Sequence, residues 1–217
     1  MAKRLIVVEG HGEDGAAPNL VNRLWQDLRL PSEVISASRP IRFSKLDSEP
    51  DVAQLCQILR TKADCDRVLV LHDDEDGCPK DSGPRLGSWL RAAALPFPVA
   101  IVLTYREYET MFLASLASLA GKPIVDPGGR TRAGIRAGAT YQGDPVAKRD
   151  AKGVVSSFMP PRQVYKPTTD QLALTRHLDF ALLRTSGLAC FGTLERALAF
   201  LARAGPGQIY PPAPNPR

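Results

Sequence analysis

Short apolar runs alternate with helical periodicity along the first half of the chain. The runs at residues 5–8, 67–71 and 99–103 are aliphatic apart from Arg67 and only four or five residues long. Runs of this length and composition are typical of strands buried on both faces of a parallel sheet. Between them, apolar residues recur every three or four positions, which predicts intervening helices. This alternation restricts the chain to an α/β fold, with a parallel-rich sheet flanked by helices.

Further periodic segments extend this pattern. A second strand is expected over 34–41, and helices are expected near 20–28, 52–62, 85–94 and 107–120. After a long segment with little periodicity, two more helices are expected over 168–186 and 193–204. The chain therefore has a C-terminal helical part that follows an irregular middle.

These patterns divide the chain into four parts. Its 217 residues can bury one substantial core but are short for two independent domains. We predict an α/β core over 1–121, a basic, glycine-rich insertion or lid over 122–166, C-terminal helices over 167–205 that complete the same domain, and a disordered tail over 206–217.

Positive charge is concentrated in the predicted insertion. The whole chain has a formal net charge of +5, whereas residues 122–166 hold nine basic and three acidic residues. Such a segment is typical of a polyanion-binding surface, because cations beside phosphates release condensed counterions, although a solvated loop has the same composition. The candidate nucleic-acid contacts in this segment are Arg136, Lys148, Arg149 and Lys152.

Acidic residues cluster where three of the predicted strands end. Glu9 follows the first strand, an acidic run at 72–76 follows another, and Glu107 and Glu109 come shortly after a third. In open α/β sheets, the loops at the carboxyl ends of neighbouring strands meet and carry functional residues. We therefore expect the three clusters to lie at one edge of the sheet.

Crowded carboxylates repel one another unless a cation neutralises them. Their hard oxygen atoms favour Mg²⁺ or Mn²⁺. A metal on acidic loops beside a basic segment indicates phosphodiester chemistry, in which the metal activates water and stabilises charge on the phosphoryl oxygens. Structural interpretations remain open: 72–76 is also a good exposed turn, and Glu107 and Glu109 also suit a helix N-terminus.

Four segments, in order, resemble a known family. They are 7–13 (Val-Val-Glu-Gly-His-Gly-Glu), 71–79, 106–113 and 165–171, the last followed by a helix that contains Asp179. Together with the strand and helix order, they resemble the Toprim domain of topoisomerases, primases and related nucleases, and more specifically the Toprim-like domain-of-unknown-function family 4276. The resemblance covers nearly the whole chain and implies a Toprim-like, Rossmann-type sheet.

The resemblance also implies roles for individual residues. Glu9 would be a general acid or base, or a carboxylate beside the metal, while Asp73 and Glu75 would hold Mg²⁺ with Asp76 in support. The alternative register pairs Asp74 with Asp76 and keeps the strict Asp-x-Asp spacing. The remaining candidates are Glu109 as a metal ligand and His11, Glu13 and Glu107 as supporting residues.

Two positions depart from the family pattern and motivate other hypotheses. Glu75 is one methylene longer than aspartate, and Gly12 stands where relatives often carry threonine. The alternative function is a non-catalytic subunit that keeps the Toprim fold and binds nucleic acid or protein. A third hypothesis is a phosphohydrolase with Asp73 as a covalent nucleophile.

The predicted function is metal-dependent hydrolysis of phosphodiester bonds in DNA or RNA. The resemblance adds an ATPase partner and a role as the effector of an anti-phage defence system. No apolar run approaches the ~20 residues of a membrane-spanning helix and no signal peptide is evident, so we expect no membrane contact. The four cysteines form no Cys-x-x-Cys pair, which favours reduced thiols and a cytoplasmic location.

Overall fold

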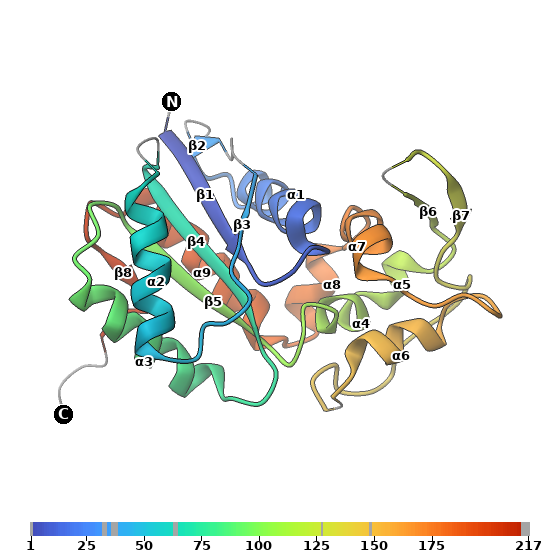
Figure 1. Cartoon of the computed structure of the whole chain (residues 1–217). Helices are drawn as coiled ribbons and strands as arrows, with labels where there is room; N and C mark the ends of the chain where they lie inside the picture. Colours follow the sequence, from blue (N-terminus) through green and yellow to red (C-terminus); the bar gives the residue numbers. More distant parts are fainter. Residues whose placement is uncertain are drawn as a thin grey trace.

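A parallel sheet forms the centre of the molecule (Figure 1). The computed structural model describes residues 2–31, 34–35, 39–62, 65–126, 128–147 and 149–213. Within them, the sheet contains β1 (Ala2–Val8), β2 (Val34–Ile35), β3 (Ile41–Arg42), β4 (Arg67–Asp74), β5 (Val99–Tyr105) and β8 (Ile209–Tyr210). The order is β2-β1-β4-β5-β8, β3 also pairs with β1, and every one of these pairings is parallel. The expected α/β fold is confirmed.

Helices cover both faces of the sheet (Figure 1). One face packs against α1 (Glu13–Asp27) and α9 (Ala189–Arg203). The other packs against α2 (Glu49–Arg60) and α3 (Pro79–Ala92). Alternate side chains of β1 enter the two hydrophobic layers. Because both faces are buried, the central strands are continuous apolar runs rather than alternating ones.

Helices α2 and α3 begin earlier than their apolar periodicity predicts. The Ser48 side chain accepts a hydrogen bond from the Asp51 backbone N–H, and the Asp51 carboxylate accepts one from the Ser48 N–H, which together form a capping box. In α3, Pro79 occupies the first turn, where its missing N–H costs no hydrogen bond. These polar first turns lie outside the apolar pattern, so the predicted starts at 52 and 85 were late.

The helices predicted over 107–120 and 168–186 are each broken in two. The resulting pieces are α4 (Thr110–Ala114), α5 (Leu116–Leu119), α7 (Pro167–Thr175) and α8 (Phe180–Thr185). The two breaks contact each other, since the Ser115 hydroxyl accepts a 3.0 Å hydrogen bond from the Asp179 backbone N–H. The Asp179 carboxylate in turn caps α8, accepting from the Ala181 N–H at 2.7 Å. A contact between residues 64 positions apart in the sequence does not alter the local hydrophobic periodicity from which the helices are predicted.

The strand predicted over 34–41 is present only as the short strands β2 and β3, and residues 36–38 lie outside the described residues. The helix predicted from 193 begins at Ala189. The predicted disordered tail over 206–217 is wrong for Ile209–Tyr210, which form β8 beside β5. Ile209 is buried in the second hydrophobic layer, and two residues are too few to show a strand pattern in the sequence.

The basic segment 122–166 folds onto the first hydrophobic layer. It contains an antiparallel hairpin of β6 (Pro123–Val125) and β7 (Thr131–Ala133), followed by α6 (Ala151–Ser157). Ile124, Ile135 and Val155 are buried in the layer shared with α1 and α9.

Among the described residues, no helix is both long and apolar enough to cross a bilayer.

A buried ion pair ties the hairpin to α7. The Asp170 carboxylate is fully buried and lies 2.6 Å from the Arg132 guanidinium. Removing the arginine leaves a buried carboxylate without its cation. We predict that Arg132→Ala lowers the free energy of unfolding by about 2 kcal/mol in urea titrations. The exposed neighbour Arg130→Ala is the control, and equal losses for both variants would contradict this role.

Candidate functional site

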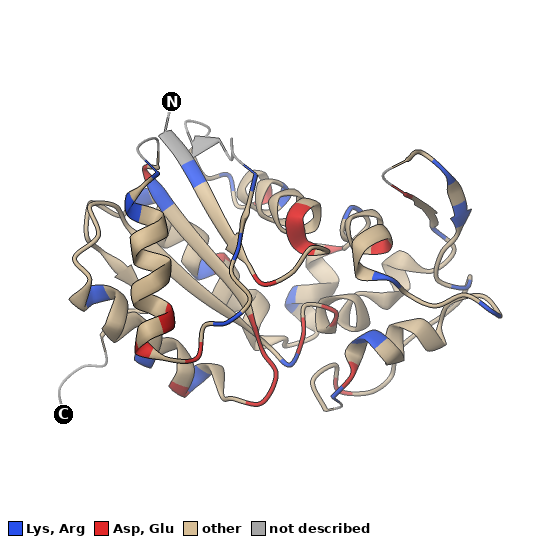
Figure 2. Cartoon of the chain, viewed as in Figure 1, with Lys and Arg blue, Asp and Glu red and all other residues tan. Residues whose placement is uncertain are grey.

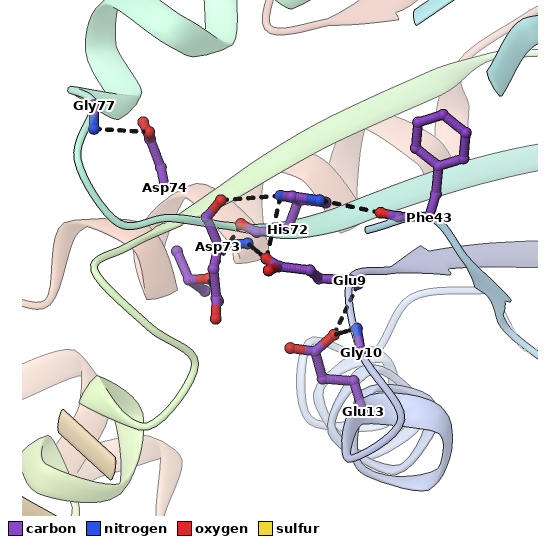
Figure 3. Close-up of polar contacts among 9 residues, drawn as sticks. Glu9, Gly10, Glu13, Phe43, His72, Asp73, Asp74 and Gly77 are labelled. Carbon is purple, nitrogen blue, oxygen red and sulfur yellow. Dashed lines mark hydrogen bonds and ion pairs between the residues drawn. The ribbon is translucent and has the colours of Figure 1, made fainter. Parts of the chain in front are cut away.

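The acidic segments meet at the carboxyl edge of the sheet. Strands β1, β4 and β5 are adjacent and parallel, with Val8 opposite Leu71 and Leu71 opposite Val102. Their ends therefore bring the loop after β1, the end of β4 and the loop after β5 together, as expected from the sequence. Figure 3 shows Glu9, Glu13 and Asp73 grouped at this edge, with His72 beside them.

Glu9 is held against the end of β4. Its Oε2 accepts from the Asp73 backbone N–H at 3.3 Å and lies 3.4 Å from His72 Nδ1 (Figure 3). His72 is nearly buried, and its two ring nitrogens also lie 2.9 Å from the Asp73 carbonyl and 3.1 Å from the Phe43 carbonyl. These oxygen acceptors fix the ring, and the ring in turn orients Glu9.

Glu13, at the start of α1, stabilises the turn that follows β1. Its Oε2 accepts from the backbone N–H groups of Glu9 at 2.9 Å and Gly10 at 3.1 Å, which closes the turn after β1. Burial raises the Glu13 pKa, and the negative charge of Glu9 adds to the rise, although these backbone bonds oppose it. Glu13 thus shapes the turn that presents Glu9 and adds a carboxyl to the cluster.

Asp73 lies at the centre of the acidic group. Its carboxyl accepts a hydrogen bond from the Thr104 hydroxyl on β5. Burial raises the Asp73 pKa well above its usual range, and the charges of Glu13, Glu109 and Glu9 raise it further. The cluster of four carboxyls, Glu9, Glu13, Asp73 and Glu109, is called the acidic cluster below.

Glu109 supplies the most deeply buried carboxyl of the acidic cluster. It is 1% exposed, and the Tyr165 hydroxyl donates to its Oε1 at 2.7 Å. Its Oε2 is buried without a hydrogen-bond partner. Burial raises the Glu109 pKa to about 7, even though Lys152 acts in the opposite direction. An unpartnered, buried carboxylate oxygen beside other carboxyls suits a bound cation.

Lys152 on α6 is the cation that faces the acidic cluster. Its Nζ lies 2.9 Å from Glu107 Oε1, and its backbone N–H donates to Glu107 Oε2 at 3.1 Å. Burial alone would lower the Lys152 pKa, but Glu109, Glu107 and Asp73 outweigh it and the pKa is raised. Lys152, predicted as a nucleic-acid contact, therefore neutralises part of the acidic cluster, while Glu107 anchors it.

The structure does not bring Glu75 and Asp76 to Asp73. Both side chains are exposed, and neither contacts Asp73 within the described part of the chain. The Glu75 carbonyl accepts from Arg106 Nη1 at 2.7 Å, and the Asp76 carboxylate pairs with Arg149. The strand ends at Asp74, so the chain turns away before these residues. The carboxyl that acts electrostatically on Asp73 comes instead from Glu109, 36 positions later in the sequence.

The other predicted residues occupy varied positions. His11 is exposed beside Glu9. Asp74 accepts from the Gly77 N–H at 3.1 Å and has its Oδ2 buried without a partner. Arg136 donates to the Ser157 carbonyl at 3.1 Å, at the far end of α6. Lys148 lies outside the described residues.

Sequence reasoning missed the residues that hold the carboxyls in place. His72 and Tyr165 stand within two of the quoted motifs but are not among the candidate site residues that the sequence gives. Thr104 at the end of β5 gave no signal, because a lone threonine in a strand is ordinary. For His72 and Tyr165, the position within a quoted motif was the available signal.

Within the described residues, no three His, Cys, Asp or Glu side chains are already arranged to hold a metal ion. The acidic cluster nevertheless fits one electrostatically, because burial raises the pKa of Asp73 and Glu109, neighbouring carboxyls raise that of Asp73 further, and Glu109 Oε2 is unpartnered. Comparison with family models, with curated proteins and with solved structures finds no match to this chain. Membership in the Toprim-like family therefore stays a prediction from the four motifs.

The raised pKa of Glu109 predicts pH-dependent stability. A carboxyl whose pKa is higher in the folded than in the unfolded chain stabilises the fold when protonated, and this contribution is lost as the pH rises through the folded value. Without divalent cations, this group should lower the free energy of unfolding by at most about 3 kcal/mol as the pH rises from about 4.5 to about 7. Urea titrations across this range should show the loss in the wild type but a smaller one in Glu109→Gln.

The exposed Glu49→Gln variant on α2 is the control and should keep the wild-type pH dependence. Adding Mg²⁺ at pH 8 should stabilise the wild type more than Glu109→Gln, because a cation bound only to the folded state adds its binding free energy. Identical pH profiles for the wild type and Glu109→Gln would contradict the raised pKa of this buried carboxyl.

Proposed function

We propose that the chain is a Toprim-like nuclease that uses Mg²⁺ or Mn²⁺ to hydrolyse phosphodiester bonds in nucleic acid. The observation that carries the proposal is the acidic cluster at the carboxyl edge of the sheet, with an unpartnered oxygen on Glu109 and one lysine facing it. Hard carboxylate ligands of this kind suit Mg²⁺ and Mn²⁺. The position at the ends of adjacent parallel strands is where such folds carry their active sites.

Asp73, Glu109 and Glu9 are the residues that would hold the metal. When bound, it would polarise the phosphoryl group and lower the pKa of a water molecule. The Thr104 hydroxyl and the Tyr165 hydroxyl hold the carboxyls of Asp73 and Glu109 in fixed orientations. A preorganised set of ligands loses little freedom when a cation arrives.

In the proposed reaction, Glu9 acts in proton transfer and Lys152 in stabilising negative charge. Glu9 is about one-third exposed and lies at the mouth of the site, so its carboxylate can take a proton from water or return one to a leaving oxygen. The Lys152 ammonium faces the same cluster from α6 and can stabilise negative charge that develops on a phosphate. Glu107 keeps that ammonium in position.

Two rival hypotheses differ in their support. A covalent phosphohydrolase needs an ionised, accessible Asp73, whereas burial and neighbouring carboxyls raise the Asp73 pKa. A non-catalytic binding subunit is favoured by one observation, namely that Lys152 already supplies a cation to the acidic cluster.

The ATPase partner, the anti-phage role and the cytoplasmic location rest on the sequence alone. Co-purification from the native host tests the partner.

A cleavage assay tests the proposed chemistry directly. The purified chain is incubated with plasmid, single-stranded DNA and total RNA in Mg²⁺, Mn²⁺ or EDTA. We expect cleavage only with metal, and a loss of roughly 100-fold or more in Asp73→Asn and in Glu9→Gln. Glu195→Gln is the control and should cleave like the wild type. It removes a carboxylate on α9 that is paired with Arg184 on α8.

Glu75→Gln decides between the two sets of metal ligands in the same assay. A change below about threefold is expected if Glu109 completes the site, since threefold is under 1 kcal/mol. A loss equal to that of Asp73→Asn would restore the sequence-based pair of Asp73 and Glu75. No cleavage of any substrate, with nucleic-acid binding that EDTA leaves unchanged, would favour the non-catalytic subunit.

A further inference from the structure

A groove runs beside Glu9 on the side of the sheet where β3 lies. Its lining residues are Glu9, Gly10, His11, Arg39, Pro40, Arg42 and Ser44. One wall is the turn after β1, and the other is the extended stretch that contains β3. Figure 2 shows lysine and arginine segments along this stretch, next to the acidic end of β1. Acidic and basic walls thus face each other across one opening.

The basic wall is rigidly attached to the acidic cluster. Arg42 stands opposite Val8 in the parallel pairing of β3 with β1, one residue before Glu9. The Phe43 N–H donates to the Val8 carbonyl at 2.8 Å, and the Phe43 carbonyl contacts His72, the residue that orients Glu9. A molecule bound by this wall would therefore lie at a fixed distance from Glu9.

The cations of the basic wall are only weakly neutralised by the chain itself. Arg39 Nη2 lies 3.3 Å and Arg42 Nε 3.7 Å from the same carboxylate, that of Asp14. The Arg39 side chain is 75% exposed, and exposed pairs of this length contribute little. Lys45 is exposed three residues further on. Two guanidinium groups that share one carboxylate leave a net positive charge on the basic wall.

The basic insertion offers fewer available cations near the acidic cluster. Arg149 pairs with Asp76, Lys152 with Glu107, and Arg132 with the buried Asp170. These partners belong to the chain, so an incoming polyanion must compete with them. A ligand at the β3 wall competes only with the contacts of Arg39 and Arg42 to Asp14, which at 3.3 and 3.7 Å are longer than these three pairs.

We infer that the groove holds the phosphodiester backbone of the nucleic-acid strand beside the acidic cluster, with Arg39 and Arg42 contacting phosphates. The planar guanidinium group matches the phosphate oxygens and can donate two parallel hydrogen bonds. From Arg39 to Lys45 an extended chain reaches about 20 Å, enough to follow several phosphates of one strand. The inference deepens the proposed nuclease function and rests on it for the orientation of the strand.

Binding measured without cleavage tests this assignment. Fluorescence anisotropy of a labelled 20-nucleotide DNA or RNA strand with the full chain in EDTA gives Kd at several KCl concentrations. We expect Arg39→Ala with Arg42→Ala to weaken binding by about tenfold and to make the salt dependence of log Kd shallower by about one to two. The control removes two exposed cations, Lys62 and Arg203, at the ends of α2 and α9 and thus at the opposite edge of the sheet.

Asp14→Asn gives the opposite change and guards against a folding artefact. Removing the shared carboxylate frees both guanidinium groups, so binding should tighten several-fold, which a merely destabilised protein would not show. Binding by the double arginine variant equal to that of the Lys62 and Arg203 control would overturn the groove assignment. Failure of the wild type to bind any strand would overturn it as well.

The groove and the proposed chemistry can fail separately. If the wild type binds with the expected arginine dependence but never cleaves in Mg²⁺ or Mn²⁺, the groove assignment holds and the nuclease proposal is wrong. If the wild type cleaves and the arginine variants bind and cleave like the control, the nuclease proposal holds and the groove assignment is wrong.

Discussion

The burial of carboxyl groups is the dominant electrostatic feature of the carboxyl edge of the sheet. Burial raises the pKa of both Asp73 and Glu109, and the charge of Glu109 adds to the rise for Asp73. Every member of the acidic cluster has its own local support, from Thr104, Tyr165, His72 and the backbone of the turn after β1. Such supports orient the carboxyls but do not cancel their charge. The arrangement is one that a cation would stabilise.

The insertion supplies part of the missing positive charge. Helix α6 carries Lys152 to the acidic cluster, and Glu107 binds both its backbone N–H and its ammonium group. The insertion is also secured by a buried ion pair of Arg132 with Asp170 on α7. The basic segment of the sequence is therefore in part a set of counter-charges for the chain's own acidic residues. Cations on the other side of Glu9, along β3, remain more accessible.

Much of the fold could be predicted because a strand that is buried on both faces has a recognisable local sequence, a short continuous apolar run. The strands β1, β4 and β5 each contain a continuous apolar run, and the topology rule for parallel sheets then places Glu9, Asp73 and Glu109 at one edge. The breaks at Ser115 and Asp179 could not be predicted, since the hydrogen bond between them joins residues 64 positions apart. Strand β8 was missed for the same reason, as two residues become a strand only by pairing with β5.

By itself, the sequence determined the class of fold, the order of the strands and helices along the chain, and the set of acidic residues available to the site. These can be predicted because hydrophobic periodicity and the position of a residue at a strand end are local properties of the sequence. Only the tertiary structure decided which of those residues act together. It replaced Glu75 with Glu109 as the neighbour of Asp73, turned Lys152 into a counter-charge and placed Arg39 and Arg42 beside Glu9. The physical reason is that electrostatic partners are chosen by distance in space, and distance along the chain carries little information about it.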